Sequence, residues 1–200
     1  MIPLTNDIYI FDCEVFAFDW LFCFKNKKTG ERTRIWNDND ALAEFMKRQP
    51  LLAGFNNKHY DQFILKAVLC NFSPEEVKAV NDYIIVDGHE GWEHPVLRDC
   101  GMYFTQYDLM DDCQMGLSLK AIEAHLGMDI RETTVSFDID RPLTEEERRE
   151  VEFYCDHDVD ATDKLDDLRQ GYLFNKLTLG REKGLEDTKA LYMTLSLIHI

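Results

Sequence analysis

The first half of the chain carries apolar and aromatic residues in short runs that are separated by polar turns. Residues 7–24 are rich in Ile, Tyr, Phe, Val and Trp, and they predict two adjacent strands with a bend near residues 14–17. The alternating segment 32–36 predicts a third strand, and the apolar run 51–55 predicts a short buried one. Residues 102–110 also have strand character. These runs together predict a sheet.

Between and after these runs, apolar residues recur at helical spacing. Ser73 followed by Pro74 is a typical helix start, and Thr144 with Glu147 three residues later forms a capping box. Helices inserted between strands favour an α/β fold with a mixed sheet flanked by helices. The helices are expected over residues 39–49, 60–71, from 74 onward, 117–126 and 144 to about 168.

Composition and charge narrow the function classes. Apolar residues make up 45% and charged residues 30% of 200 residues, as expected for one folded domain, or for one domain and part of another. The chain has 22 Lys and Arg residues against 38 Asp and Glu residues, and its net charge is −16. This charge excludes a protein that binds duplex DNA or an anionic membrane through an overall positive charge. A nucleic acid bound locally through divalent cations stays compatible with this charge.

The cysteines and histidines predict no zinc site. The six cysteines are scattered without CxxC spacing, which favours buried reduced thiols in a cytosolic protein over a metal site or a disulfide scaffold. His89 and His94 are one residue too far apart for an HExxH motif. No apolar run approaches the roughly 20 residues that span a bilayer, and no signal peptide is apparent. We therefore expect a cytoplasmic protein with no membrane partner.

Acidic residues stand at places where chemistry is expected. Asp12 and Glu14 lie two apart near the end of the first strand, and therefore on one face of it. Asp61 follows the short buried strand, at the head of an apolar helix. Tyr154 and Asp158 are four apart, which places the phenol and the carboxylate on one face of a helix.

Gathered carboxylates repel one another unless a hard cation lies between them, and Mg²⁺ and Mn²⁺ prefer such oxygen ligands. Two such ions can activate a water and stabilise the leaving oxygen of a phosphodiester. Each acidic position also has an ordinary structural explanation when it is taken alone. Asp12 and Glu14 fit a solvated strand edge, Asp61 fits a helix cap, and Asp158 fits the solvated face of an acidic helix.

Three motifs occur in a characteristic order: FDCE at residues 11–14, NNKHYD at 56–61 and YCDHD at 154–158. They resemble the three motifs of the DEDD 3′→5′ exonucleases, and more closely those of the proofreading exonuclease domain of bacteriophage DNA polymerases. The tyrosine subclass is favoured because Phe153 stands where the histidine subclass has its histidine. The resemblance covers about residues 7–171 and includes the segment SLKAIEAHLGM before the third motif.

The resemblance implies a ribonuclease H-like fold and a role for each motif residue. Asp12, Glu14 and Asp158 would hold the metal that activates water, and Asp12 would bridge to a second metal. Asp61 would support that second ion, largely through water. Tyr154 would orient the attacking water. The cofactors are then two divalent ions, Mg²⁺ or Mn²⁺.

The implied substrate is the 3′ end of single-stranded DNA, and three residues are candidates to contact it. Asn57 would contact the strand, as its counterpart does in protein-primed phage polymerases. Phe16, beside the first motif, is a candidate to stack on terminal bases, although core packing explains it equally well. Lys120 is a candidate to touch a phosphate, with a solvent-facing charge as the alternative.

The implied activity is metal-dependent hydrolysis of the strand from its 3′ end, which releases nucleoside monophosphates. Residues 1–170 would form the exonuclease domain, and 171–200 the truncated helical start of a following segment that leads toward a polymerase domain. The final six residues, LSLIHI, are given no role. A free-standing exonuclease acting on DNA or RNA and a non-catalytic nucleic-acid-binding module are the alternatives. If the gene belongs to a phage, the protein would act in the cytoplasm of the bacterial host.

Overall fold

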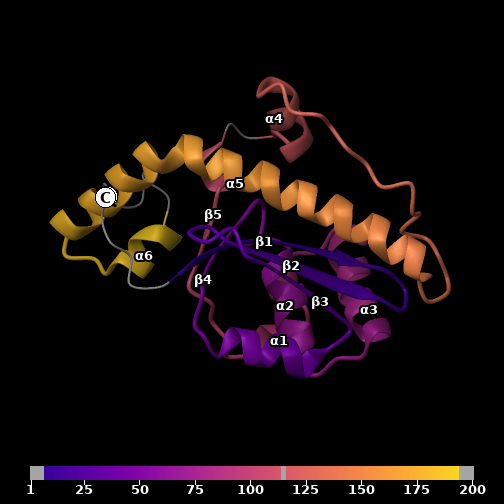
Figure 1. Ribbon diagram of the computed structural model, residues 1–200. Helices are drawn as coiled ribbons and strands as arrows, with labels where there is room; N and C mark the ends of the chain where they lie inside the picture. Colours follow the sequence, from indigo (N-terminus) through magenta and orange to yellow (C-terminus); the bar gives the residue numbers. More distant parts are fainter. Residues whose placement is uncertain (1–6, 114–115, 194–200) are drawn as a thin grey trace.

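The structure, a computed structural model, describes residues 7–113 and 116–193 and is built on one five-stranded mixed sheet (Figure 1). The strand order is β3-β2-β1-β4-β5, and β2 runs antiparallel to the other four strands. This arrangement confirms the predicted α/β fold with a mixed sheet flanked by helices. The strands are β1 (Ile8–Val15), β2 (Trp20–Asn26), β3 (Arg32–Trp36), β4 (Leu51–Gly54) and β5 (Gln106–Asp108).

Helices cover both faces of the sheet. In Figure 1 the long helix α5 crosses one face, while α1, α2 and α3 lie on the other. The α-helices are α1 (Asn39–Met46), α2 (Asp61–Leu69), α3 (Pro74–Ile85), α4 (Leu119–His125), α5 (Glu145–Glu182) and α6 (Asp187–Tyr192). Within the described residues, short 3₁₀ turns lie between α3 and α4: η1 (Gly91–Glu93), η2 (Leu97–Asp99) and η3 (Met110–Asp112).

The alternation of side chains along β1 separates two apolar cores. Ile10 and Phe16 pack in the core beneath α5, whereas Phe11 and Val15 pack in the core formed with α1, α2 and α3. Because a strand repeats every two residues, the even-numbered positions between Ile10 and Phe16 face α5 as well. The fold therefore places the two acidic residues of the first motif under that helix.

Two predicted elements differ in length from the observed ones. The strand expected over 102–110 is only three residues long, because its partner β4 offers only Leu52–Gly54 for pairing. The helix expected to end near residue 168 runs on to Glu182, and α6 folds back against it. Gly180 permits this contact, since a Cβ there would lie 2.5 Å from the Ala190 Cβ.

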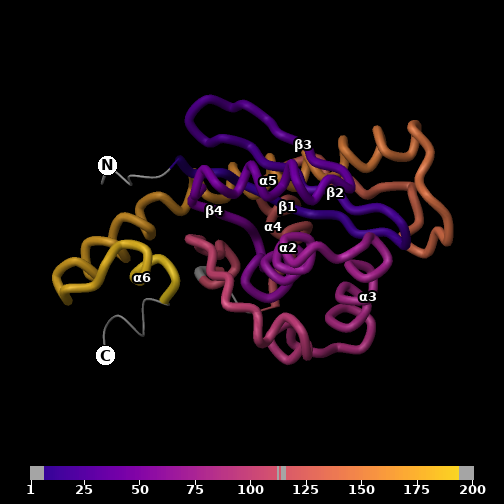
Figure 2. The backbone as a smooth tube through the Cα atoms, turned by 90° about the horizontal axis from the view of Figure 1, so that it is seen from below, coloured from indigo at the N-terminus to yellow at the C-terminus, as the bar shows by residue number. Residues whose placement is uncertain are grey.

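The C-terminal part of α5 extends beyond the sheet, with α6 beside it, in both views (Figures 1 and 2). The boundary predicted near residue 170 falls inside this continuous helix. Residues 194–200, which include the predicted LSLIHI tail, lie outside the described residues.

Candidate metal centre

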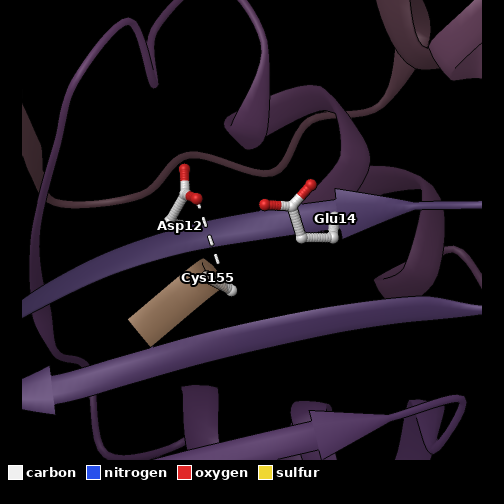
Figure 3. A group of neighbouring side chains, drawn as sticks. All are labelled: Asp12, Glu14 and Cys155. Carbon is white, nitrogen blue, oxygen red and sulfur yellow. Dashed lines mark hydrogen bonds between the residues drawn. The ribbon is translucent and has the colours of Figure 1, made fainter. Parts of the chain in front are cut away.

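Asp12 and Glu14 lie where β1 has passed its last pairing with β4. That parallel pairing covers only Ile8–Ile10, so the acidic pair stands at the open edge beyond it. In Figure 3 both carboxylates stand on the same side of β1, next to Cys155 of α5. The Cys155 thiol donates to Asp12 Oδ2 at 3.8 Å, and the ligand atoms of Asp12, Glu14 and Cys155 lie within 4.8 Å of one another.

Asp61 is brought to the same place by α2. It is the first residue of the helix, and Tyr60 precedes it as the N-cap without a capping side-chain bond, so Asp61 is not a cap. Its carboxylate is buried, and its Oδ1 has no hydrogen-bond partner among the described residues. Burial raises the pKa of Asp61 to about 7.

Tyr154 and Asp158 approach from α5, one helical turn apart. The Tyr154 hydroxyl donates to the Asp158 carboxylate, and burial followed by the Asp158 charge raises the pKa of Tyr154. Lys120 of α4 ion-pairs with Asp158, and its Nζ lies 4.9 Å from the centre of the Tyr154 ring. The predicted sharing of one helix face by Tyr154 and Asp158 is therefore observed.

We call Asp12, Glu14, Asp61 and Asp158 the acidic cluster. Burial raises the pKa of Asp12 well above its usual range, and the charges of Asp61 and Asp158 raise it further. The pKa of Glu14 is raised in the same way, by burial and then by Asp12 and Asp158. Lys120 is the cation in direct contact with this cluster among the described residues, so negative charge remains in excess.

This donor set fits a hard divalent cation. Carboxylate oxygens are the ligands that Mg²⁺ and Mn²⁺ prefer. The buried Asp61 Oδ1 has no hydrogen-bond partner among the described residues, and such an ion would supply one. The Cys155 thiol is a poorer ligand for these ions, and burial raises its pKa, which favours the protonated form. The oxygen donors of the acidic cluster therefore define the candidate metal centre.

Asn57 lies apart from any surface that a nucleic acid can reach. Its side chain is fully buried, and its amide lies 2.8 Å from the Gln106 side-chain oxygen. With the amide turned over, its nitrogen donates to the carbonyl oxygens of Gly54 and Tyr107 at 3.1 and 3.3 Å. The structure thus gives Asn57 a structural role, tying the end of β4 to β5, in place of the predicted contact with a single strand.

Phe16 differs from its predicted role, whereas Lys120 lies at the site. Phe16 has no exposed surface, and its ring stacks on Phe137 with centroids 5.0 Å apart, so it belongs to the core and cannot stack on a base in this structure. Lys120 is partly exposed, and its ammonium group is paired with carboxylates of the site. Its Nζ pairs with Asp158 and lies 3.6 Å from Glu123 Oε2, which places its charge inside the site.

Sequence reasoning missed Asp108, which holds the segment that leads to Asp61. The buried Asp108 carboxylate accepts hydrogen bonds from the backbone N–H groups of Asn56, Lys58 and Met110 at 2.8 to 2.9 Å. Asn56 has a φ of 65°, in the left-handed region that Asn adopts more readily than most residues. A single Asp at the end of a short strand carries no local signal of this role, because Asn56 and Lys58 lie 52 and 50 residues earlier.

Comparison with protein-family models, with curated proteins and with solved structures found no match to this chain. Among residues 7–113 and 116–193, none of the helices combines the length and the apolar character needed to cross a bilayer.

Proposed function

We propose that this chain is a metal-dependent 3′→5′ exonuclease of the tyrosine subclass of the DEDD family, with a ribonuclease H-like fold. Its substrate would be the 3′ end of single-stranded DNA, and its products nucleoside monophosphates. The proofreading part of a phage-type DNA polymerase is the setting that the resemblance favours. One observation carries the proposal: Asp61 of α2 and Asp158 of α5 lie near enough to Asp12 of β1 for their charges to raise its pKa, although the three elements are far apart in sequence.

The energetics of the cluster support a metal role over a structural one. Structural carboxylates in folded proteins are normally paired or hydrogen-bonded, which lowers their pKa. Asp12 and Glu14 have raised pKa values instead, because burial and the charges of neighbouring carboxylates disfavour their charged forms. The pKa of Asp61 is raised mainly by burial, although the Cys13 thiol hydrogen-bonds to it. A site that is destabilising by itself is expected where function requires it.

Each residue can then be given a task. Asp12, Glu14 and Asp158 would hold one divalent ion and Asp61 would support a second. Such ions, when bound, lower the pKa of a water and neutralise the charge of the leaving oxygen. Tyr154 contributes a hydroxyl that hydrogen-bonds to Asp158, and this hydroxyl would orient the attacking water.

Lys120 supplies a positive charge to the same centre. Its pairing with Asp158 and its position over the Tyr154 ring hold α4 against α5. When substrate is present, the same ammonium group can face the scissile phosphate, since Asp158 would then share its charge with a cation. Lys120 is therefore a further candidate for substrate binding, as the sequence predicted, but from inside the cluster.

The direct test is strand degradation with defined ends. A 5′-labelled DNA single strand should shorten stepwise from its 3′ end in Mg²⁺ or Mn²⁺, with nucleoside monophosphates as products. Chelation should stop the reaction, and a strand blocked at its 3′ terminus should resist it. The rate on an RNA strand of the same sequence, compared with the rate on DNA, shows whether a 2′-hydroxyl group is tolerated. Equal degradation in excess chelator, or release of internal fragments from the blocked strand, would refute the proposal.

A further inference from the structure

Two cysteine thiols that are 30 residues apart in the sequence lie in contact. The Sγ atoms of Cys70, which ends α2, and Cys100, in the loop between α3 and β5, are 3.5 Å apart, and both residues are partly exposed. The remaining thiols lie elsewhere: Cys13, Cys23 and Cys155 are buried, and Cys113 is partly exposed and donates to the Leu109 carbonyl at 3.2 Å. Among the described cysteines, only the first pair combines contact with access from solvent.

The segment that carries Cys100 packs closely against α2. At Gly91 an added Cβ would lie 2.2 Å from the Phe63 ring, so the backbone there lies directly on the helix. Leu97 is buried in the same core as Phe63 and other residues of α2. Residues 91–100 therefore form a strap across α2, and the contact between Cys70 and Cys100 closes its end.

We propose that Cys70 and Cys100 are a redox-sensitive pair that forms a reversible disulfide by exchange with a small disulfide such as oxidised glutathione. A thiolate of the pair attacks a glutathione sulfur, which forms a mixed disulfide and releases one glutathione thiol. The second thiolate then attacks the protein sulfur and releases the other glutathione. Two electrons pass from the cysteines to the small disulfide, and two protons end on the two glutathione thiols.

The geometry requires only a small movement. A disulfide has an S–S distance near 2.04 Å, so the sulfurs must approach by roughly 1.5 Å, within the reach of side-chain rotation and a slight shift of the strap. The bond would fasten the strap to α2, the helix whose other end carries Asp61. It would also close a loop from residue 70 to residue 100, which restricts the unfolded chain.

The experiment uses the full chain with Cys113→Ser, because residues 99–120 contain no internal Lys or Arg and would otherwise carry two cysteines in one tryptic peptide. The protein is treated with oxidised glutathione at about pH 8.5, where a useful fraction of thiol is ionised, although burial raises the pKa of Cys70. Remaining thiols are alkylated. Tryptic mapping should then find peptides 67–78 and 99–120 joined, with the loss of two hydrogen atoms.

The thermal midpoint of the joined protein should rise by about 5–10 °C and return to its starting value with dithiothreitol. The added Cys100→Ser change should abolish the joined peptide and leave a glutathione adduct on Cys70. Separate adducts on Cys70 and Cys100 in native buffer would overturn the proposal. A bond to one of the buried cysteines, or a joined peptide that forms in concentrated urea alone, would overturn it as well.

Discussion

Helix α5 contributes carboxylates to two places that differ in how their negative charge is balanced. On one side, Asp158 joins the acidic cluster, where Lys120 is its cation partner. On the other side, α5 presents what we call the ion-paired row to cations of the hairpin β2–β3. The row consists of Asp156, Asp160, Asp163, Asp166 and Asp167, and its partners are Lys25, Lys27, Arg32 and Arg34.

The two sets differ in the direction of their pKa shifts. Burial alone would raise the pKa of Asp163, but hydrogen bonds from Lys25 at 2.6 Å and Lys27 at 2.8 Å bring it below its usual value. In the acidic cluster burial and neighbouring carboxylates act together and raise the pKa of Asp12. The hairpin supplies the cations that the row needs, whereas the cluster is left to obtain positive charge from outside the chain.

The largest expected difference is in catalysis. Asp12→Asn should lower the rate of single-strand degradation by about 10³-fold or more, because the loss of a metal ligand removes several kcal/mol of transition-state stabilisation. Asp156→Asn, a matched change in the ion-paired row, should leave the rate within about twofold. Single-turnover cleavage with Mg²⁺ measures both. Similar rates for the two variants would end the distinction between the two acidic sets.

A smaller effect is expected from the phenol that borders the acidic cluster. Tyr154→Phe removes the hydroxyl that bonds to Asp158 and should lower the rate by at most about 10²–10³-fold, while metal binding survives. Asp158→Asn should be worse, since it removes a ligand and its charge. Phe153→Leu is the control from the adjacent, exposed ring, and its rate should stay close to the wild-type rate. If Tyr154→Phe and Asp158→Asn both kept the wild-type rate, with unchanged circular dichroism, these two side chains of α5 would take no part in catalysis.

The acidic cluster should also make stability depend on pH in a way that the ion-paired row does not. Asp61 has a folded-state pKa of about 7 against an ordinary value of 3.8, so the folded state binds the proton more tightly. Its contribution to stability is full below pH 3.8 and is lost as the pH rises through 7. In chelator, the thermal midpoint should therefore fall by about 5 °C between pH 5 and pH 8, and Mg²⁺ should restore it at pH 8.

Matched variants test the origin of this pH dependence. Asp61→Asn should raise the midpoint at pH 8 in chelator and flatten its pH dependence, because the repulsive charge is gone. Asp160→Asn should lower the midpoint at both pH values, since it removes a carboxylate that pairs with Lys25 and Arg32. A fall in the midpoint for Asp61→Asn would show that this carboxylate is stabilising and would contradict the comparison.

The sequence anticipated what depends on local periodicity. The alternation along β1 puts Asp12 and Glu14 on one face, and the four-residue spacing in α5 brings Tyr154 and Asp158 together, as predicted. What depends on contacts distant in sequence was not predicted. Asn57 and Phe16 contact Gln106 and Phe137, which lie 49 and 121 residues later in the chain, and Asp108 binds backbone groups 50 and 52 residues earlier.

The ion-paired row shows the same limit. Taken alone, an acidic helix fits a solvated face, and the sequence of α5 gives no sign that a hairpin more than 120 residues earlier supplies cations to its acidic residues. Spacing identifies which side chains share a face, but the tertiary fold decides what that face meets. The charge balance that separates the two acidic sets is therefore visible only in the folded chain.

The smallest expected effect concerns the best-shielded cation of the row. Lys27 pairs with Asp163, Asp166 and Asp167 at 2.7 to 2.8 Å, and its side chain is 18% exposed, while Asp166 is buried. Lys27→Met keeps most of the aliphatic stem but leaves these carboxylates without that partner. We expect the free energy of unfolding in urea to fall by about 1–3 kcal/mol, between the values typical of exposed and of buried pairs. Arg34→Met, at a more exposed pair with Asp156, should lower the free energy of unfolding by less than about 1 kcal/mol.

Neither change should alter the cleavage rate at a temperature where the protein is folded, because both cations lie on the side of α5 that faces the hairpin. A loss of activity without a loss of stability in Lys27→Met would mean that the row takes part in the chemistry, and the separation of the two acidic sets would fail.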